Sequence, residues 1–325
     1  MITTFFKKKY RIILRTLISA LILTVLLYKI NSREVLDRLT DSQWEFFLLL
    51  FGLDIAGFFA RSWRWKIILE IWDIHIPIST LFFYSQGGRT LNFILPSSIG
   101  GDVYRMYLTT KNSNKKTGSI VGIVIDRLTG MSTGFFLAGC ATLFLFTRSI
   151  PIPHIYIILA IIAGWFVMIG ILFSNKLHEF VQNRSAENTF FDKLNKFFIS
   201  ISIAKQHPAV IAKALCISVL VKFHEILVAY FVARALSLPV PLFFCMAFIP
   251  VISFLTVLPI SISGIGIRES MVIFFFTRIG LTPTAAFSLS ITVFTWMALM
   301  GMCGGLIYLI WWVITGNYAH RSRAK

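Results

Sequence analysis

The sequence predicts an all-α polytopic membrane protein with about six full transmembrane helices and two shorter, broken helical segments. Of its 325 residues, 57% are hydrophobic and 14% are charged, and the mean hydropathy is +0.78. A soluble domain of this size would need more charge on its surface. The apolar residues form blocks of about 20 residues, the length of helix that crosses a bilayer. A transmembrane β-barrel would instead show alternating segments of about ten residues, which this sequence lacks.

Six apolar blocks are long enough to cross the membrane. They cover residues of about 12–30, 44–60, 118–147, 154–173, 209–234 and 282–314. The first block follows the basic segment 7–11 and so resembles a signal peptide, but no small-residue cleavage site closes it. We therefore expect the first block to remain in the protein as a transmembrane helix.

Two further apolar segments are interrupted by glycine and proline. Between 78 and 108, two pieces too short to cross the membrane are broken at 87–89 and at 96–102. The segment 240–280 is broken by Pro250 and again after Leu258. Short, interrupted apolar segments favour re-entrant hairpins, which enter and leave on one side of the membrane. We predict that these hairpins bend at Pro96, Gly100, Gly101, Pro259, Gly264 and Gly266.

The distribution of lysine and arginine predicts the orientation in the membrane. Cytoplasmic loops carry an excess of these residues. With the N-terminus in the cytoplasm, five basic stretches that hold 20 of the 31 Lys and Arg residues lie there, namely 7–15, 61–66, 105–116, 174–207 and 321–325. We expect both termini and the loop 174–207 to be cytoplasmic, and the protein to lie in the cytoplasmic (inner) membrane. The net charge of +17 is then explained by topology and does not indicate nucleic-acid binding.

The two broken segments resemble each other. Leu95–Asp102, LPSSIGGD, compares with Leu258–Gly266, LPISISGIG, and an arginine follows each. Each predicted hairpin is preceded by one span and followed by a long one, in opposite orientations. This pattern predicts an inverted repeat, about 44–147 and about 209–314, within a single membrane domain. Transporters of this architecture bind their substrate at the interface between the repeats.

Ionisable residues inside the apolar segments are candidates for a substrate site, because lipid tolerates charge only where it is paired or hydrated. The predicted site comprises Arg89, Asp102, Arg105, Asp126, Arg127, His224, Glu225, Arg268 and Glu269. Arginines that converge in a membrane cavity would suit a phosphate, because the guanidinium fork binds two oxygens at once. Alternatively, some of these charges join helices: Asp126 and Arg127 would then form interhelical ion pairs near the cytoplasmic interface, and Lys222 would extend toward the interface.

The sequence gives little support for a catalytic or a metal-binding motif. His224–Val228 begins like the HExxH motif of zinc proteases, but Val228 stands where the second histidine is needed. Neither a GxSxG motif nor a Walker loop occurs, and the four cysteines form no CxxC pair. We therefore predict no enzyme, metal or cofactor.

Several short motifs follow one another along the chain in an informative order. They are Arg61-x-x-Arg64-Trp65, Asn92-x-x-x-Pro96, Gly101-Asp102-x-x-Arg105, Asp126-Arg127-Leu128 and Pro259-x-x-x-x-Gly264-x-Gly266-x-Arg268-Glu269. From about 10 to 315 the chain thus resembles the lysylphosphatidylglycerol synthase transmembrane-region family, a flippase-like membrane domain. It departs from the family pattern at Asp102, where members usually have glutamate, and at Gly130, where they have an acidic residue. The soluble aminoacyl-transfer domain of the fused synthases is absent, so we do not expect this chain alone to aminoacylate lipids.

The resemblance implies translocation of a lipid or a lipid-linked precursor between the leaflets of the membrane. The implied cargo is an anionic phospholipid or a polyprenyl-phosphate-linked sugar, and Asn92 joins the predicted site on this basis. An alternative function is a non-transporting partner that scaffolds a lipid-modifying enzyme or a glycosyltransferase. A third hypothesis, a membrane-embedded transferase, would use Asp102 or Glu269 as its carboxylate.

Overall fold

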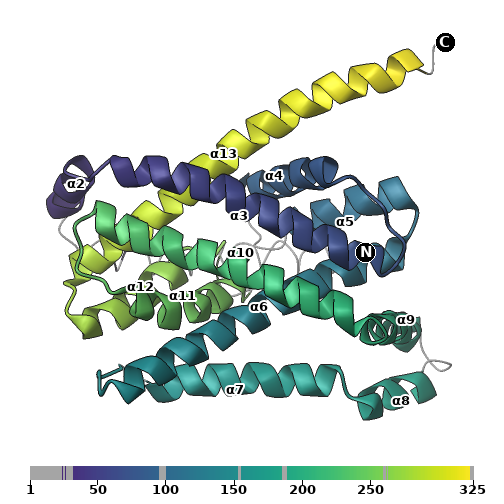
Figure 1. Cartoon of the computed structure of the whole chain (residues 1–325), viewed down its shortest axis with the longest axis horizontal. Coiled ribbons are helices and arrows are strands. Elements are labelled where there is room, and N and C mark those ends of the chain that lie inside the picture. Colours follow the sequence, from purple (N-terminus) through teal and green to yellow (C-terminus); the bar gives the residue numbers. More distant parts are fainter. Residues whose placement is uncertain are drawn as a thin grey trace.

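A computed structural model gives the arrangement of the helices (Figure 1). It describes residues 24, 26, 32–94, 100–152, 155–184, 189–258, 261 and 263–322. Within these ranges the secondary structure is helical and no strand occurs. The predicted all-α class is therefore confirmed.

Five helices of the described chain are long and apolar enough to cross a membrane. They are α3 (Glu45–Glu70), α6 (Lys116–Thr147), α7 (Ile155–Leu172), α10 (Pro208–Ala235) and α13 (Pro283–Ser322). Each coincides with one of the six predicted spans. The remaining predicted span, about 12–30, lies outside the described residues except for two positions.

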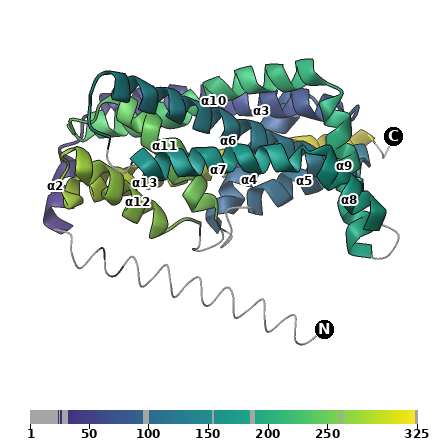
Figure 2. The ribbon, with the colours of Figure 1, turned by 90° about the horizontal axis from the view of Figure 1, so that it is seen from below.

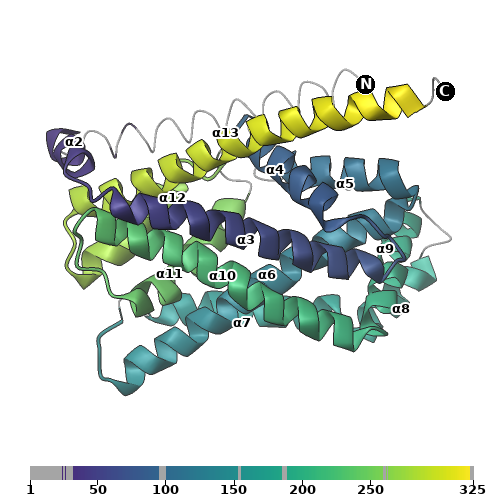
Figure 3. The same ribbon diagram turned by 45° about the horizontal axis from the view of Figure 1, so that its top comes forward.

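The two predicted broken segments form helical hairpins. The first hairpin consists of α4 (Ile78–Ile94) and α5 (Gly100–Ser113), and the second of α11 (Leu242–Val257) and α12 (Ile267–Phe276). These helices have 17, 14, 16 and 10 residues, fewer than the roughly 20 that cross a bilayer. In all three views the first hairpin lies toward one end of the long helices and the second toward the other end (Figures 1, 2 and 3).

Three predicted interruptions fall inside continuous helices. Helix α4 passes through Gly87 and Gly88, α11 passes through Pro250, and α3 continues past Arg61 to Glu70 instead of ending near residue 60. The glycines allow close packing rather than a bend: a Cβ on Gly88 would lie 2.9 Å from the Gly101 carbonyl oxygen. Proline is tolerated in such helices because neighbouring groups satisfy the freed backbone carbonyl.

Two of the six predicted bend positions, Gly264 and Gly266, lie between the helices of a hairpin. Gly100 and Gly101 form the first turn of α5, while Pro96 and Pro259 lie outside the described residues. Gly264 and Gly266 adopt positive φ angles of +77° and +85° just before α12. Glycine is favoured there because side chains with a Cβ rarely adopt this backbone conformation.

The segment 174–207, which the sequence predicts to be a cytoplasmic loop between two spans, is largely helical. It contains α8 (Asn175–Arg184) and α9 (Thr189–Lys205). The buried side chains Phe198, Ile201 and Ala204 recur three residues apart on one face of α9 and belong to the same apolar cluster as Trp65 of α3. These apolar contacts order a segment that its charges alone marked as a loop. Two short elements, α2 (Ser32–Thr40) and η1 (Thr277–Ile279), lie near the opposite end of the long helices (Figure 1).

Helices α3 and α10 lie side by side and antiparallel. The Gln43 backbone N–H, just before α3, donates to the Ala235 carbonyl at the end of α10 (2.9 Å). Gly57 makes close contact possible halfway along, because a Cβ there would lie 2.3 Å from Cγ of His224. This approach brings the polar side chains of the two helices into contact.

We expect Gly101→Ala to lower the free energy of unfolding by about 1–3 kcal/mol, the usual cost of overpacking. The added Cβ would lie 2.1 Å from the Gly88 carbonyl oxygen, a backbone atom that cannot swing aside. Denaturation of the purified protein in mixed micelles measures the change. Gly52→Ala is the matched control, since nothing lies within 4 Å of its added Cβ. Equal stability of the two variants would contradict the packing described here.

Candidate functional site

A cavity of about 390 Å³ lies within the helical bundle. Helices α3, α4, α5, α6, α10, α11, α12 and α13 all contribute to its wall. Nine of the ten predicted site residues line it: Arg89, Asn92, Asp102, Arg105, Asp126, Arg127, His224, Glu225 and Arg268. Residues that are far apart in the sequence are therefore gathered around a single space.

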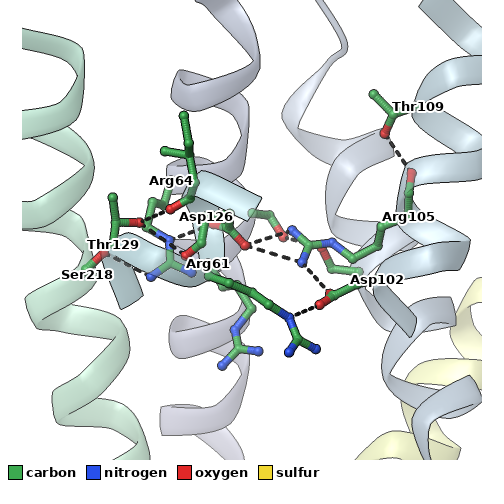
Figure 4. Close-up of polar contacts among 12 residues, drawn as sticks. Arg61, Arg64, Asp102, Arg105, Thr109, Asp126, Thr129 and Ser218 are labelled. Atoms are coloured by element: carbon green, nitrogen blue, oxygen red, sulfur yellow. Dashed lines mark hydrogen bonds and ion pairs between the residues drawn. The ribbon is translucent and has the colours of Figure 1, made fainter. Parts of the chain in front are cut away.

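Asp126 of α6 lies between two arginines from other helices (Figure 4). Its Oδ1 accepts from Nε of Arg64 on α3 (2.7 Å), and its Oδ2 accepts from both Nη atoms of Arg105 on α5 (3.3 Å each). Arg64 also donates through Nη1 to Oγ of Ser218 on α10 (2.9 Å). The three charged residues are 2–6% exposed, so a single buried carboxylate joins α3, α5 and α6.

Asp102, in the first turn of α5, extends this network. Its Oδ1 accepts from Nη1 of Arg105 (3.3 Å), and its Oδ2 accepts from Nε of Arg127 on α6. The guanidinium of Arg105 also lies over the ring of Trp65, 3.9 Å from the ring centre. Arg105 is thus occupied by two carboxylates and an aromatic face.

A second buried group centres on Asp54, in the middle of α3. His224 of α10 donates through Nε2 to Asp54 Oδ1 (2.7 Å), and Arg89 of α4 donates through Nη2 to Asp54 Oδ2 (3.4 Å). The Arg89 guanidinium lies 4.1 Å from the centre of the Phe58 ring. Asp54 is 2% exposed, and it ties the first hairpin to both α3 and α10.

Glu225 of α10 forms the third group. Its Oε1 accepts from Nη2 of Arg61 on α3 (2.7 Å), and its Oε2 accepts from Nζ of Lys222, one turn earlier on α10 (2.6 Å). The side chains of Arg61 and Glu225 are 33% and 24% exposed, so this pair is more accessible than the Asp126 network.

Arg268, in the first turn of α12, has a different environment. Its Nη2 donates to the Ser263 carbonyl oxygen (3.2 Å), and its guanidinium lies over the Phe294 ring, 4.7 Å from the centre. Its Nη1 is buried and has no hydrogen-bond partner among the described residues. Nearby, Asn92 of α4 accepts from the Gly101 backbone N–H through Oδ1 (2.7 Å) and from Ser263 Oγ through its carbonyl (3.2 Å). Asn92 therefore connects the first hairpin to the turn that precedes α12 in the second hairpin.

Glu269 is the predicted site residue that does not line the cavity. It is 2% exposed, and its Oε2 accepts from the Gly266 backbone N–H (2.6 Å). This bond satisfies a backbone N–H at the N-terminus of α12. The structure thus gives Glu269 a local role in holding the turn before Arg268.

The predicted site omitted four charged residues that line the cavity: Asp54, Arg61, Arg64 and Lys222. The arginines sit in a basic cluster that follows an apolar block, which is also the pattern of residues that set topology. Asp54 could have been found, because an acidic residue in the middle of a predicted span is rare unless it is functional or paired.

The wall of the cavity combines charge with apolar surface. Its charged members are seven cations, Arg61, Arg64, Arg89, Arg105, Arg127, Lys222 and Arg268, and four carboxylates, Asp54, Asp102, Asp126 and Glu225. Its apolar members include Phe58, Phe93, Phe135, Phe254 and Phe294. A group of three or more His, Cys, Asp or Glu side chains that could hold a metal ion does not occur among the described residues. The arrangement suits an amphipathic anion.

Many of the charged residues of this cavity belong to the short sequence motifs that the family resemblance rests on. The family model for the lysylphosphatidylglycerol synthase TM region matches residues 12–305. The chain belongs to this family. A UPF0104 membrane protein of Methanocaldococcus jannaschii is 24% identical over 288 residues, which cover 83% of this chain and 85% of the relative. No solved structure matches the chain.

One departure of this family member from the family pattern has a structural consequence. A Cβ on Gly130 would lie 2.9 Å from Nη1 of Arg64, so the guanidinium occupies the space beside the glycine. The carboxylate that Arg64 binds is that of Asp126, one turn earlier on α6. With glycine at 130, Arg64 can reach between α6 and α10 to Ser218.

We expect Asp126→Asn to lower the free energy of unfolding by about 3–5 kcal/mol, because it leaves the buried Arg64 without its carboxylate and leaves Arg105 with Asp102 alone. Asparagine keeps the shape of the side chain, so the change isolates the charge. Denaturation in mixed micelles measures it. Asp73→Asn is the control: that side chain is 83% exposed and pairs with Lys115 at 3.7 Å, so its loss should cost less than about 1 kcal/mol. Similar effects of both variants would contradict the structural role of Asp126.

Proposed function

We propose that this protein translocates an anionic lipid, or a lipid-linked precursor, between the leaflets of the cytoplasmic membrane. The observation that carries the proposal is the excess of cations, seven against four carboxylates among the described residues, around one cavity that is lined by helices of membrane-spanning length and by both hairpins. Such charge is unfavourable in a membrane interior unless it meets water or an opposite charge. The phosphate of a lipid would supply that opposite charge.

The apolar part of the cavity wall supports a lipid rather than a small soluble anion. Phe93 and Phe294 contact each other, with ring centres 5.9 Å apart, and Arg268 lies against the second ring. A lipid presents a charged headgroup next to an apolar chain. A cation beside a pair of aromatic rings matches that combination.

The two hairpins would provide the route by which the lipid moves between the leaflets. We propose that they are re-entrant and belong to an inverted repeat, with the α8–α9 end of the bundle in the cytoplasm. Each hairpin contributes charged residues to the cavity, Arg89 and Arg105 from the first and Arg268 from the second. Movement of one hairpin relative to the other would then open the cavity toward one leaflet at a time.

The ion pairs within the cavity favour a second candidate function. Six of the seven cations pair with a carboxylate, and one of these pairs, Arg61 with Glu225, joins helices from the two halves of the chain. A network of this kind would also suit a rigid membrane partner that scaffolds a lipid-modifying enzyme or a glycosyltransferase. Measured lipid movement by the purified protein would separate the two functions.

We expect Arg268→Gln to slow translocation of an anionic phospholipid by at least about tenfold, since hydrogen bonds to a charged group contribute about 1.5–3 kcal/mol. The assay uses proteoliposomes and a lipid labelled on its acyl chain, whose fluorophore in the outer leaflet is destroyed by an impermeant reductant. Its readout is the rate at which protected lipid becomes accessible.

Arg278→Gln is the matched control for this assay. Arg278 lies ten residues farther along the chain and is exposed on η1, away from the cavity lining. Its loss should leave the rate unchanged. If the wild type, both variants and empty vesicles all give the same rate, the proposed transport is wrong, and the scaffold function gains support.

A further inference from the structure

The charges around the cavity do not balance among the described residues. Four carboxylates face the seven lining cations, and the buried carboxylate of Glu269 lies next in sequence to the lining residue Arg268. Set against the seven lysine and arginine side chains, these five carboxylates leave two positive charges uncompensated. The same low dielectric that strengthens the existing pairs makes this excess unfavourable in the empty site.

Of the seven lining cations, Arg268 has its positive charge least compensated. The other six lining cations each pair with Asp54, Asp102, Asp126 or Glu225, whereas no carboxylate of the described chain lies within 4.0 Å of the Arg268 guanidinium. Its Nη1 is buried and has no hydrogen-bond partner in the part of the chain that the structure describes. The guanidinium carbon lies over the Phe294 ring, 4.7 Å from its centre.

We propose that the cavity binds a lipid headgroup with two negative charges on phosphate, and that Arg268 contacts this phosphate directly. The inference rests on the proposed function and narrows its cargo. A phosphomonoester carries about −1.5 to −2 charges at neutral pH. A diphosphate that joins a polyprenyl chain to a sugar also carries two. The phosphodiester of phosphatidylglycerol carries a single charge and would leave part of the excess uncompensated.

The arrangement around Arg268 fits a phosphate at this position. Its turn is fixed on one side by Glu269, which accepts from the Gly266 backbone N–H, and on the other by the bond from Ser263 Oγ to the Asn92 carbonyl. The guanidinium is thus held in place before a ligand arrives, and a preorganised donor loses less entropy on binding. A guanidinium can bind two phosphate oxygens at once.

The test compares the binding of two lipids with identical acyl chains, phosphatidic acid and phosphatidylglycerol. Native mass spectrometry of the full-length protein in detergent gives both dissociation constants at about pH 8, where the monoester is doubly charged. Phosphatidylethanolamine, which has no net charge, reports non-specific uptake. Inorganic phosphate in large excess is added in a separate arm as a soluble competitor.

We expect the wild type to bind phosphatidic acid at least about tenfold more tightly than phosphatidylglycerol, because one more negative charge is neutralised. Arg268→Gln should reduce this preference toward one, and Arg278→Gln should leave it unchanged. Equal binding of the two lipids by the wild type would overturn the proposal, and this comparison does not depend on any variant folding. If a folded Arg268→Gln protein keeps the full preference for phosphatidic acid, the role of Arg268 is wrong. Displacement of the lipid by inorganic phosphate would show that the site binds a soluble anion.

These outcomes are distinct from those of the transport assay. If phosphatidylglycerol binds and moves as well as phosphatidic acid, translocation stands and the doubly charged headgroup is wrong. If phosphatidic acid binds selectively but no lipid moves, the headgroup assignment stands and translocation is wrong.

Discussion

The structure depends on the ion pairs that Asp126 makes with Arg64 and Arg105. Helices α3, α5 and α6 meet at this carboxylate, and each brings a charge that the membrane interior would not otherwise tolerate. The pairing is therefore a condition for burying these residues at all. Because a buried ion pair is often no more stable than an apolar contact of similar size, its presence in this bundle suggests a role beyond stability. The cavity wall that the three helices share gives that role a location.

Small residues allow the charges to meet. Gly57, Gly88, Gly101 and Gly130 each lie where a methyl group would collide with a partner from another helix, and two of those partners are the charged or polar side chains of Arg64 and His224. In membranes, close approach of helices through small residues replaces the hydrophobic driving force of soluble proteins. Here the same contacts bring the arginines within reach of the carboxylates. Packing and electrostatics are thus set by the same positions.

Much of the fold could be predicted because lipid imposes a simple length rule. The spans at α3, α6, α7, α10 and α13 follow from apolar blocks of sufficient length. The ends of helices were harder, because Arg61 and Arg64 after an apolar block look like residues that stop a span. Their carboxylate partners lie on α6 and α10, more than 60 residues away in the sequence. Only these contacts show that α3 continues through Arg61 and Arg64. The helices within 174–207 were not predicted for a similar reason, since the apolar face of α9 packs against α6, which lies far from it in the sequence.

The site was predicted in composition but not in the roles of its members. Most of the candidate residues do gather at the cavity, because ionisable groups in apolar segments have few other places to lie. Arg105 and Arg268 were equivalent in the sequence, as each follows a broken segment. In the structure Arg105 is held by Asp102 and Asp126, whereas Arg268 has no carboxylate partner among the described residues. Roles of this kind depend on contacts between distant segments, which spacing along one chain does not reveal.

The central claim is that the cavity is a binding site for an anionic lipid. The most direct measurement is mass spectrometry of the lipids that remain with the protein when it is extracted from its own membrane into nanodiscs with a minimal lipid annulus. The account predicts enrichment of a lipid with an anionic phosphate headgroup over its share of the membrane, and loss of that enrichment in Arg268→Gln. A retained lipid mixture that matches the surrounding membrane in both proteins would contradict it.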